Sequence, residues 1–245
     1  MLRQPSTEGQ RTEDWRQARA GSVTGSGFAD VLMKLKGGGE AKTRQTYRMK
    51  ILAERITGQP AADVSAPALS WGKDNEEPAR LAYEMHMAAH GDSVYVEQVG
   101  FQQHPDLDWV GTSPDGFVGD RGMVEIKCPF NTTVHLLTII NASKALALAL
   151  LGEMKPGDLI EVPAEHMPQI QGNLWVTGRE WCDFVSYDPR VPEHLQLYVT
   201  RVYRDEAYIK NLEAEVRKFL DEIEVNVSVL LDETVDSFPK PKESK

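Results

Sequence analysis

Residues 113–130 read SPDGFVGDRGMVEIKCPF, and we predict the fold outward from the second half of this stretch. There Glu125 and Lys127 are one residue apart, and apolar residues fill the positions around them: Val124, Ile126 and Cys128. A period of two residues is typical of a β-strand, whose alternate side chains point to opposite faces. We therefore predict a strand with its apolar face in the core and with Glu125 and Lys127 in a cleft.

Asp115 precedes this strand and lies between a proline and a glycine, a combination that favours a tight turn. Two carboxylates on adjoining strands supply the hard oxygen ligands that Mg²⁺ or Mn²⁺ prefers. Lys127 can hold or deprotonate a water and offset the charge on a phosphate, so the set fits phosphodiester hydrolysis. Taken alone, the spacing of Asp115, Glu125 and Lys127 is explained better by ordinary surface charges beside a hairpin than by an active site. The buried strand face and the fixed turn favour an active site.

Composition and charge limit the class of protein. With 245 residues, 41% hydrophobic and 26% charged, the chain suits one large globular domain. The net charge of −10 argues against a protein that coats DNA non-specifically. Residues 1–60, however, carry 11 Lys/Arg against 6 Asp/Glu. A nucleic-acid path is therefore expected in the N-terminal third, unless its helix faces merely happen to be basic.

Cysteine use and hydropathy favour a reducing cytoplasm as the location. Cys128 and Cys182 form no CxxC pair and are expected to be free thiols. The first residues contain no apolar segment typical of a signal peptide, so secretion is not expected. No run of about 18 apolar residues occurs, and no membrane span or membrane partner is expected.

Hydrophobic periodicity predicts helices and strands along the whole chain. Helices are expected at 15–21, after Ser26, around 47–56, and at 75–90, 132–151, 163–177 and 205–233. Strands are expected at 94–101, 109–118, 123–128, 159–162, 182–187 and 195–203. This order predicts an α/β (α+β) fold, a sheet flanked by helices. Residues 1–12 are expected to be disordered, 13–235 to form a single domain, and 236–245 to be a flexible tail.

Polar residues elsewhere are candidates for the same cleft. Ser26 precedes an apolar helical stretch, and a helix N-terminus there would bind an anion together with Arg19 and Thr24. Equally, Ser26 simply caps the helix and Arg19 is a surface arginine. Glu76 is placed either to form a solvated pair with Arg80 one turn later or to add a carboxylate to the cleft.

Six blocks occur in an order that resembles the phage recombination exonucleases of the lambda exonuclease (YqaJ-like) family: WRQARAGSVTGS, ALSWGKDNEEPAR, SPDG, VEIKCPF, QIQGNLWVT and YDPR. The resemblance covers the chain from about Trp15 to the last strands. It implies the restriction-endonuclease-like PD-(D/E)xK fold, with a central mixed sheet flanked by helices. Members of this family digest the 5′-ended strand of linear duplex DNA to mononucleotides and leave a 3′ overhang.

The resemblance also implies roles for individual residues. Those that match catalytic positions are Asp115, Glu125 and the carbonyl of Ile126 as metal ligands, Lys127 and Gln169 beside the attacking water, and Glu76 as an assisting carboxylate. Those that match the 5′-phosphate pocket are Arg19, Ser26 and Ser113, and those near the DNA end are Trp15 and Leu69. Gln171 lies on a different helix face from Gln169, so at most one of the two reaches the metal.

The cofactor implied is Mg²⁺, with Mn²⁺ as an alternative, and the partners implied are duplex DNA with 5′-phosphorylated ends, two further copies in a homotrimer, and a single-strand-annealing protein. The setting is the cytoplasm of a bacterial host, with a phage or prophage gene. Two features depart from the family: the segment 131–168 is longer, and Thr133 stands where an arginine is expected. Two rival functions remain, a site-specific or structure-specific endonuclease of this fold and a non-catalytic DNA-end binding protein.

Overall fold

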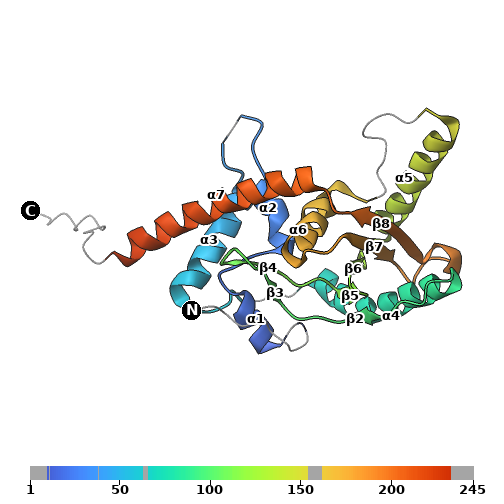
Figure 1. The fold of residues 1–245 in the computed structure, drawn as a ribbon, viewed down its shortest axis with the longest axis horizontal. Coiled ribbons are helices and arrows are strands. Elements are labelled where there is room, and N and C mark those ends of the chain that lie inside the picture. Colours follow the sequence, from blue (N-terminus) through green and yellow to red (C-terminus); the bar gives the residue numbers. More distant parts are fainter. Residues whose placement is uncertain (1–9, 11, 38, 63–65, 154–161, 233–245) are drawn as a thin grey trace, which may run out of the picture.

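The computed structural model describes residues 10, 12–37, 39–62, 66–153 and 162–232 (Figure 1). Its helices are α1 (Glu13–Arg19), α2 (Phe28–Leu32), α3 (Lys42–Thr57), α4 (Pro67–Ala89), α5 (Thr132–Leu151), α6 (Met167–Thr177) and α7 (Glu206–Leu231). Three short 3₁₀ turns accompany them: η1 (Gly25–Gly27), η2 (Ala164–His166) and η3 (Glu193–Leu195).

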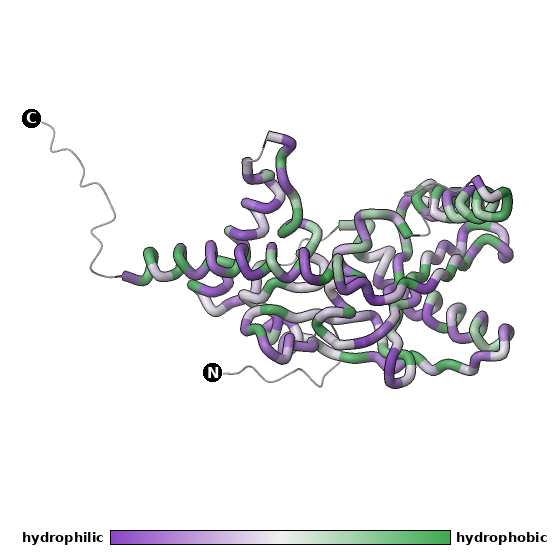
Figure 2. The backbone as a smooth tube through the Cα atoms, turned by 45° about the horizontal axis from the view of Figure 1, so that its top comes forward, coloured by the Kyte–Doolittle hydropathy of each residue, from purple (hydrophilic) through white to green (hydrophobic). Residues whose placement is uncertain are grey.

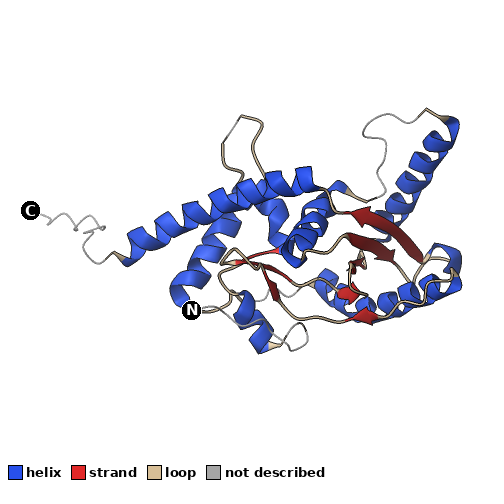
Figure 3. Cartoon of the chain, viewed as in Figure 1, coloured by secondary structure: helices blue, strands red, loops and turns tan. Residues whose placement is uncertain are grey.

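The centre of the molecule is a mixed five-stranded sheet in the order β2-β5-β6-β7-β8 (Figure 3). Its strands are β2 (Val96–Glu97), β5 (Gly116–Val118), β6 (Gly122–Lys127), β7 (Trp181–Tyr187) and β8 (Leu197–Tyr203). β6 and β7 run parallel, and the other neighbours are antiparallel. A second sheet has the order β1-β4-β3 and consists of β1 (Val23–Thr24), β3 (Gln102–Gln103) and β4 (Val110–Thr112).

Helices cover both faces of the five-stranded sheet. On one face, Ala79 and Tyr83 of α4 pack with strand residues: Val96, Val118, Val124, Ile126, Val185 and Tyr187. On the other face, α6 packs its apolar side chains on the sheet: Ile170 and Leu174 against Met123, Cys182 and Phe184. The alternation predicted for β6 is confirmed, because Val124 and Ile126 pack towards α4 while Glu125 and Lys127 bond to residues of α6.

A helical core lies beside the sheet, where α7 packs with α2, α3 and α6. Asp205 caps α7 by accepting hydrogen bonds from the amides of Ala207 and Tyr208. Apolar residues at the helical spacing of three or four then form the buried stripe: Ile209, Leu212, Val216, Phe219 and Ile223. The last turns of α7 extend past this core (Figure 1), and their apolar side chains are exposed: Val225, Val229, Leu230 and Leu231.

The first turns of α5 contact β7, and the rest of the helix extends away from the sheet at one side of the molecule (Figure 1). Apolar residues recur along the helix (Figure 2). It begins after the cap Asn131 and ends at Gly152, whose φ of 70° is a conformation that glycine adopts without strain. Within the described residues it is the one helix long and apolar enough to cross a membrane, by length and composition alone, with 17% of its most apolar window buried. The helix is apolar on average, but Asn141 and Lys144 interrupt it, so it is not the unbroken apolar run that a membrane span was expected to need.

The mixed sheet flanked by helices confirms the predicted fold class. The largest difference in the elements is at α4, which begins at Pro67, so that Leu69 lies on a helix where a loop was expected. Proline is well suited to the first turn of a helix, because its missing N–H would have no partner there. The helix expected after Ser26 is α2, which has only five residues and follows η1.

Strand predictions erred mainly in length. The strand expected at 109–118 is two strands, β4 and β5, which belong to different sheets and are separated by the turn at Pro114 and Asp115. The strand expected at 94–101 is reduced to Val96–Glu97. Most of the strand expected at 159–162 lies outside the described residues, as do residues 1–9 and the predicted tail. In the stretch expected to be disordered, Gln10 bonds to the carbonyl of Pro114 at 2.7 Å.

Candidate active site

One cavity of about 460 Å³ gathers all the residues that the sequence assigned to the site except Thr24, which lines a smaller cavity beside it. The lining of the larger cavity includes the predicted catalytic group Asp115, Glu125, Ile126, Lys127, Gln169 and Glu76, and the predicted DNA-end group Arg19, Ser26, Ser113, Trp15 and Leu69. These residues come from α1, η1, α4, the β4–β5 turn, β6 and α6. Segments far apart in the chain therefore converge where β6 ends, while the chemical role of each residue stays a prediction.

The turn before β5 fixes Asp115 against β6. One carboxylate oxygen of Asp115 accepts a hydrogen bond from the amide of Ile126 at 2.6 Å. The pairing of β5 with β6 places Gly116 opposite Val124, so this contact follows from the sheet register. The carboxylate of Asp115 is thereby held beside Glu125, as the pattern in the sequence indicates.

Glu125 is only 1% exposed, and both of its oxygens are bonded. Oε1 accepts from the ammonium of Lys127 at 2.6 Å, and Oε2 accepts from the side-chain amide of Asn173 at 3.0 Å. Lys127 also donates to Oε1 of Gln169 at 3.0 Å. Gln171 instead bonds to the backbone of Tyr203, which confirms that one glutamine of the pair reaches the site.

The carboxylates of the cavity repel each other. Burial raises the pKa of Asp115 well above its usual value, and the negative charges of Glu125 and Glu76 raise it further. Burial alone would lower the pKa of Lys127, but the charges of Glu125 and Asp115 raise it, so the lysine is an ammonium. The cluster thus stabilises positive charge.

Glu76 lines the cavity from α4, as one of the two alternatives predicted for it. Arg80, the partner in the other alternative, lies 3.7 Å from Glu77. α4 is fixed to the sheet by a buried group in which Tyr83 donates to Asp183 at 2.7 Å and Arg201 donates to both oxygens of the same carboxylate. This anchor positions the whole wall that carries Leu69 and Glu76.

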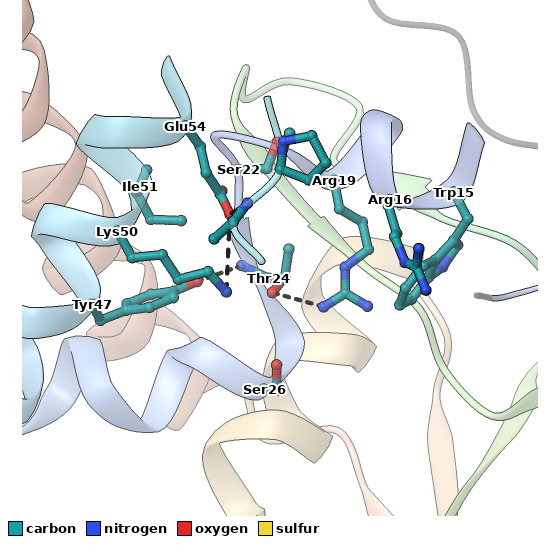
Figure 4. Close-up of a pocket in the computed structure, with 13 residues that line it drawn as sticks. Trp15, Arg16, Arg19, Ser22, Thr24, Ser26, Tyr47, Lys50, Ile51 and Glu54 are labelled. Carbon is teal, nitrogen blue, oxygen red and sulfur yellow. Dashed lines mark hydrogen bonds and ion pairs between the residues drawn. The ribbon is translucent and has the colours of Figure 1, made fainter. Parts of the chain in front are cut away.

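The predicted phosphate pocket is built around Arg19. Its guanidinium lies 4.1 Å over the ring of Trp15 and donates to the hydroxyl of Thr24 at 3.3 Å (Figure 4). The indole N–H of Trp15 in turn donates to the hydroxyl of Ser113 at 2.9 Å. A second, smaller cavity of about 150 Å³ shares Trp15, Arg19 and Ser26 with the larger one.

The helix N-terminus expected to bind an anion at Ser26 is not a strong one. Ser26 lies exposed in η1, and α2 has only five residues, so few peptide dipoles are aligned there. Any attraction for an anion must therefore come mainly from Arg19 and the hydroxyl groups. Tyr47 of α3 supports this loop, because its hydroxyl accepts a hydrogen bond from the amide of Thr24 at 3.1 Å.

The YDPR block (187–190), which received no role from the sequence, connects two of the elements that carry the cavity. The guanidinium of Arg190 donates to both oxygens of Asp188 and to the carbonyls of Pro129 and Phe130, just after β6. It also lies 4.1 Å over the ring of Trp71 on α4. The block therefore joins the end of the central strand to the helix that carries Glu76.

Comparison with known proteins identifies a family and similar structures. Residues 14–180 match the YqaJ-like viral recombinase domain family. The crystal structure of an alkaline exonuclease (LHK-Exo) from Laribacter hongkongensis is 38% identical, with a TM-score of 0.73 over 89% of this chain and 96% of that chain. The same values hold for LHK-Exo in complex with dAMP. Among curated proteins, none matches the chain.

A phage related exonuclease from Haemophilus somnus 129PT shares the fold at 13% identity, with a TM-score of 0.61 over 88% of this chain and 99% of that chain. The sheet, its flanking helices and the likeness to alkaline exonuclease define a nuclease of the restriction-endonuclease-like fold. Within that class, the chain belongs to the YqaJ-like viral recombinase domain family.

Proposed function

We propose that this protein is a metal-dependent 5′-to-3′ exonuclease that degrades the 5′-ended strand of linear duplex DNA to mononucleotides. The 3′ overhangs would then serve recombination by single-strand annealing. One observation carries the proposal: Asp115, Glu125 and Lys127 share a cavity with Arg19 and Ser113. A hydrolytic group and a cationic, hydroxyl-lined pocket within one cavity suit an enzyme that cuts next to a phosphorylated end. The match to alkaline exonuclease supports the same reaction class.

The donor set fits Mg²⁺, or Mn²⁺ in its place. The described residues hold no group of three or more His, Cys, Asp or Glu side chains placed for a metal, but Mg²⁺ commonly takes one or two carboxylates and keeps several waters. Asp115 and Glu125 supply those carboxylates, and the carbonyl of Ile126 is the third protein ligand. Their mutual repulsion, which raises the pKa of Asp115, would be relieved by a divalent cation. When bound, the ion stabilises the charge that develops on phosphate oxygens during hydrolysis.

Lys127 and Gln169 hold the attacking water in this proposal. The ammonium of Lys127 lies within 3.0 Å of the side-chain oxygen of Gln169, so a water beside this pair has a donor and an acceptor to orient it. A water held in line with the scissile bond gains the rate advantage of fixed proximity. The buried position of Glu125 keeps the ammonium of Lys127 charged and in place.

Arg19 anchors the 5′-phosphate in this proposal. A guanidinium forms two parallel hydrogen bonds with a phosphate, and Arg19 is already oriented by Trp15 and Thr24. Ser113 and Ser26 offer hydroxyls at the same cavity. Trp15 and Leu69 would meet the terminal base pair, and Leu69 is 53% exposed, as a side chain that separates strands must be.

The assembly and setting belong to the same proposal. We infer a homotrimer in the cytoplasm of a bacterial host, encoded by a phage or prophage, with a single-strand-annealing protein as partner. The exposed apolar residues at the end of α7 and along α5 offer surface for such contacts. Sedimentation of the purified chain would show the trimer, and a monomer at working concentration would contradict it.

The test is digestion of a linear duplex that carries a 5′-phosphate on one strand only, with Mg²⁺ present. The phosphorylated strand should disappear as mononucleotides while its complement remains. Lys127→Ala and Asp115→Ala should reduce the rate by at least about 10³-fold with DNA binding retained, as expected for groups that act on the reacting atoms.

Two outcomes would contradict the proposal. Cutting of covalently closed circular DNA at a rate similar to linear DNA would indicate the endonuclease alternative. Binding to duplex ends without any Mg²⁺-dependent release of nucleotides would indicate a non-catalytic end-binding protein.

A further inference from the structure

Asn173 is a buried amide on α6 that contacts Glu125. It lies in the QIQGNLWVT block, but neither the sequence analysis nor the proposed reaction gives it a role. Its side chain is 0% exposed. Its nitrogen donates to Oε2 of Glu125 at 3.0 Å, and its oxygen accepts from the hydroxyl of Thr112. A carboxylate only accepts hydrogen bonds, so the nitrogen must face Glu125 and the oxygen must face Thr112. The two partners thus fix the orientation of the amide.

Asn173 also touches the segments that carry the predicted phosphate pocket. Thr112 immediately precedes Ser113, and Gly25 immediately precedes Ser26. A side chain at Gly25 would collide with the amide oxygen of Asn173 and with the hydroxyl of Thr112, so the loop packs directly on this pair. One side chain therefore joins β6, β4 and η1, the three elements that place the two halves of the site.

The contact has a specific effect on Glu125. Oε1 of this carboxylate is bonded to Lys127 on the cavity side, and Oε2 is bonded to Asn173 on the core side. Without a donor at Oε2, a carboxylate that is 1% exposed would lose a charge-assisted hydrogen bond, and among the described residues Asn173 is the one that donates to this oxygen. The carboxylate of Glu125 would then rotate to bring Oε2 to another hydrogen-bond donor.

We propose that Asn173 is a positioning residue that fixes Glu125 for the divalent ion and sets its place relative to the phosphate pocket. The inference rests on the proposed function, since it needs a metal at Asp115 and Glu125. Partners that orient a metal ligand from behind commonly change metal affinity or activity by about 10- to 100-fold when removed. A purely structural amide would change stability without changing metal affinity.

The experiment measures Mn²⁺ binding by titration calorimetry on the intact protein without DNA. Asn173→Ala should weaken the affinity for Mn²⁺ by about 10- to 100-fold. Thr112→Val keeps the side-chain shape at position 112 and the bond between Asn173 and Glu125, but it removes the donor to the amide oxygen of Asn173. Its affinity for Mn²⁺ should therefore fall by less than that of Asn173→Ala. The nuclease activity of Asn173→Ala should recover, at least in part, as the Mg²⁺ concentration is raised.

Gln171→Ala is the matched control, because Gln171 is also a buried amide on α6 but bonds to the backbone of Tyr203 and Asp205. It should lower thermal stability and leave the affinity for Mn²⁺ unchanged. A folded Asn173→Ala protein with wild-type affinity and the same Mg²⁺ dependence would overturn the inference and leave the exonuclease proposal intact. If Asn173→Ala does not fold, wild-type affinity for Mn²⁺ in Thr112→Val would overturn it. Failure of the unaltered protein to bind Mn²⁺ would contradict the metal site itself.

Discussion

At the scale of single residues, Arg19 offers the sharpest test of the phosphate pocket. Replacing it with alanine should reduce kcat/KM on 5′-phosphorylated ends by about 10- to 100-fold, since hydrogen bonds to charged groups contribute about 1.5–3 kcal/mol. Activity on 5′-hydroxyl ends should change little. Arg19→Lys keeps the charge but loses the planar fork, so it should restore only part of the preference. The measurement is initial rate on matched phosphorylated and hydroxyl duplexes.

Arg16 is the control for Arg19. It lies on the same helix and lines the smaller cavity, but it does not line the cavity that holds Asp115. Arg16→Ala should therefore leave the preference for phosphorylated ends within about twofold, below the usual effect of a buried charged contact. Equal loss of the preference in both variants would show that general positive charge, and not the geometry of Arg19, selects the end.

Asp188 predicts how stability responds to acid. Burial opposes its charge, but hydrogen bonds from Arg190 prevail and hold the pKa of Asp188 at about 2. Because the folded pKa lies below the unfolded value, the pair stabilises the fold above about pH 4 and loses this effect as the pH falls towards 2. Urea unfolding at a series of pH values should show that the difference in free energy of unfolding between wild type and Asp188→Asn becomes smaller below pH 4. A difference independent of pH would contradict this prediction.

Periodicity and turn chemistry could assign only residues near one another in the chain, and the more distant site residues were assigned through the family resemblance. Glu125 and Lys127 follow from strand alternation, and Asp115 follows from the turn that precedes the next strand. Asn173 is 48 residues from Glu125, and Tyr47 is 23 residues from Thr24. No periodicity joins such distant residues, so only the packing of α6 and α3 reveals their contacts. A buried polar residue within an apolar helix was the one available signal for Asn173.

At the scale of secondary structure, two leucines on different helices should respond very differently to truncation. Leu212 on α7 is fully buried in the helical core, whereas Leu150 on α5 is 79% exposed. Leu212→Ala should lower the free energy of unfolding by about 2–5 kcal/mol, because it loses apolar burial and leaves a cavity. Leu150→Ala should change it by less than about 0.5 kcal/mol. Denaturant unfolding of both variants is the measurement.

Comparable destabilisation by the two truncations would mean that the exposed face of α5 is covered in solution. Such a result would locate a contact between chains, because nothing within the described residues packs over Leu150. Repeating the unfolding at several protein concentrations would show whether the cover comes from a second chain, since stability that depends on association rises with protein concentration.

Long amphipathic helices and the central strands were predictable, and the short strands were not. The stripe of α7 repeats often enough to define a helix, and β6 has a clear alternation. β2, β3 and β4 have only two or three residues each, too few for a period to show. The start of α4 was predicted at residue 75 and lies at Pro67, because its first two turns contain a proline, a serine and a glycine, which favour a loop. Its position depends on Tyr83 and Asp183, which bond across about a hundred residues of chain.

At the scale of the whole molecule, charge is distributed differently from what the sequence indicates. Several basic side chains of the N-terminal third pair with acids on α7: Arg44 with Glu222 at 2.7 Å, Lys34 with Glu215 at 2.7 Å and Arg55 with Glu224 at 3.4 Å. This part of the excess positive charge is therefore used within the protein. The cavity is itself lined by basic residues, among them Arg19 and Lys73, and a DNA path would use these.

Removal of metal should lower the stability of the whole fold. Binding to the folded state alone adds about 2.7 kcal/mol when the free metal exceeds its Kd a hundredfold, so the melting temperature should fall on addition of EDTA. Asp115→Asn removes one of the two repelling charges. It should melt above the metal-free wild type and show no response to Mg²⁺. A variant that melts lower than the metal-free wild type would contradict the repulsion between Asp115 and Glu125.

α6 has almost no free surface, and eight of its residues are buried: Pro168, Ile170, Gln171, Gly172, Asn173, Leu174, Trp175 and Val176. It completes the cluster on the sheet through Ile170 and the cluster of helices through Trp175. Neither side of the molecule can close its hydrophobic interior without this one helix. If the chain were divided into two fragments, the fragment without α6 would therefore lack part of its hydrophobic core and would not fold independently.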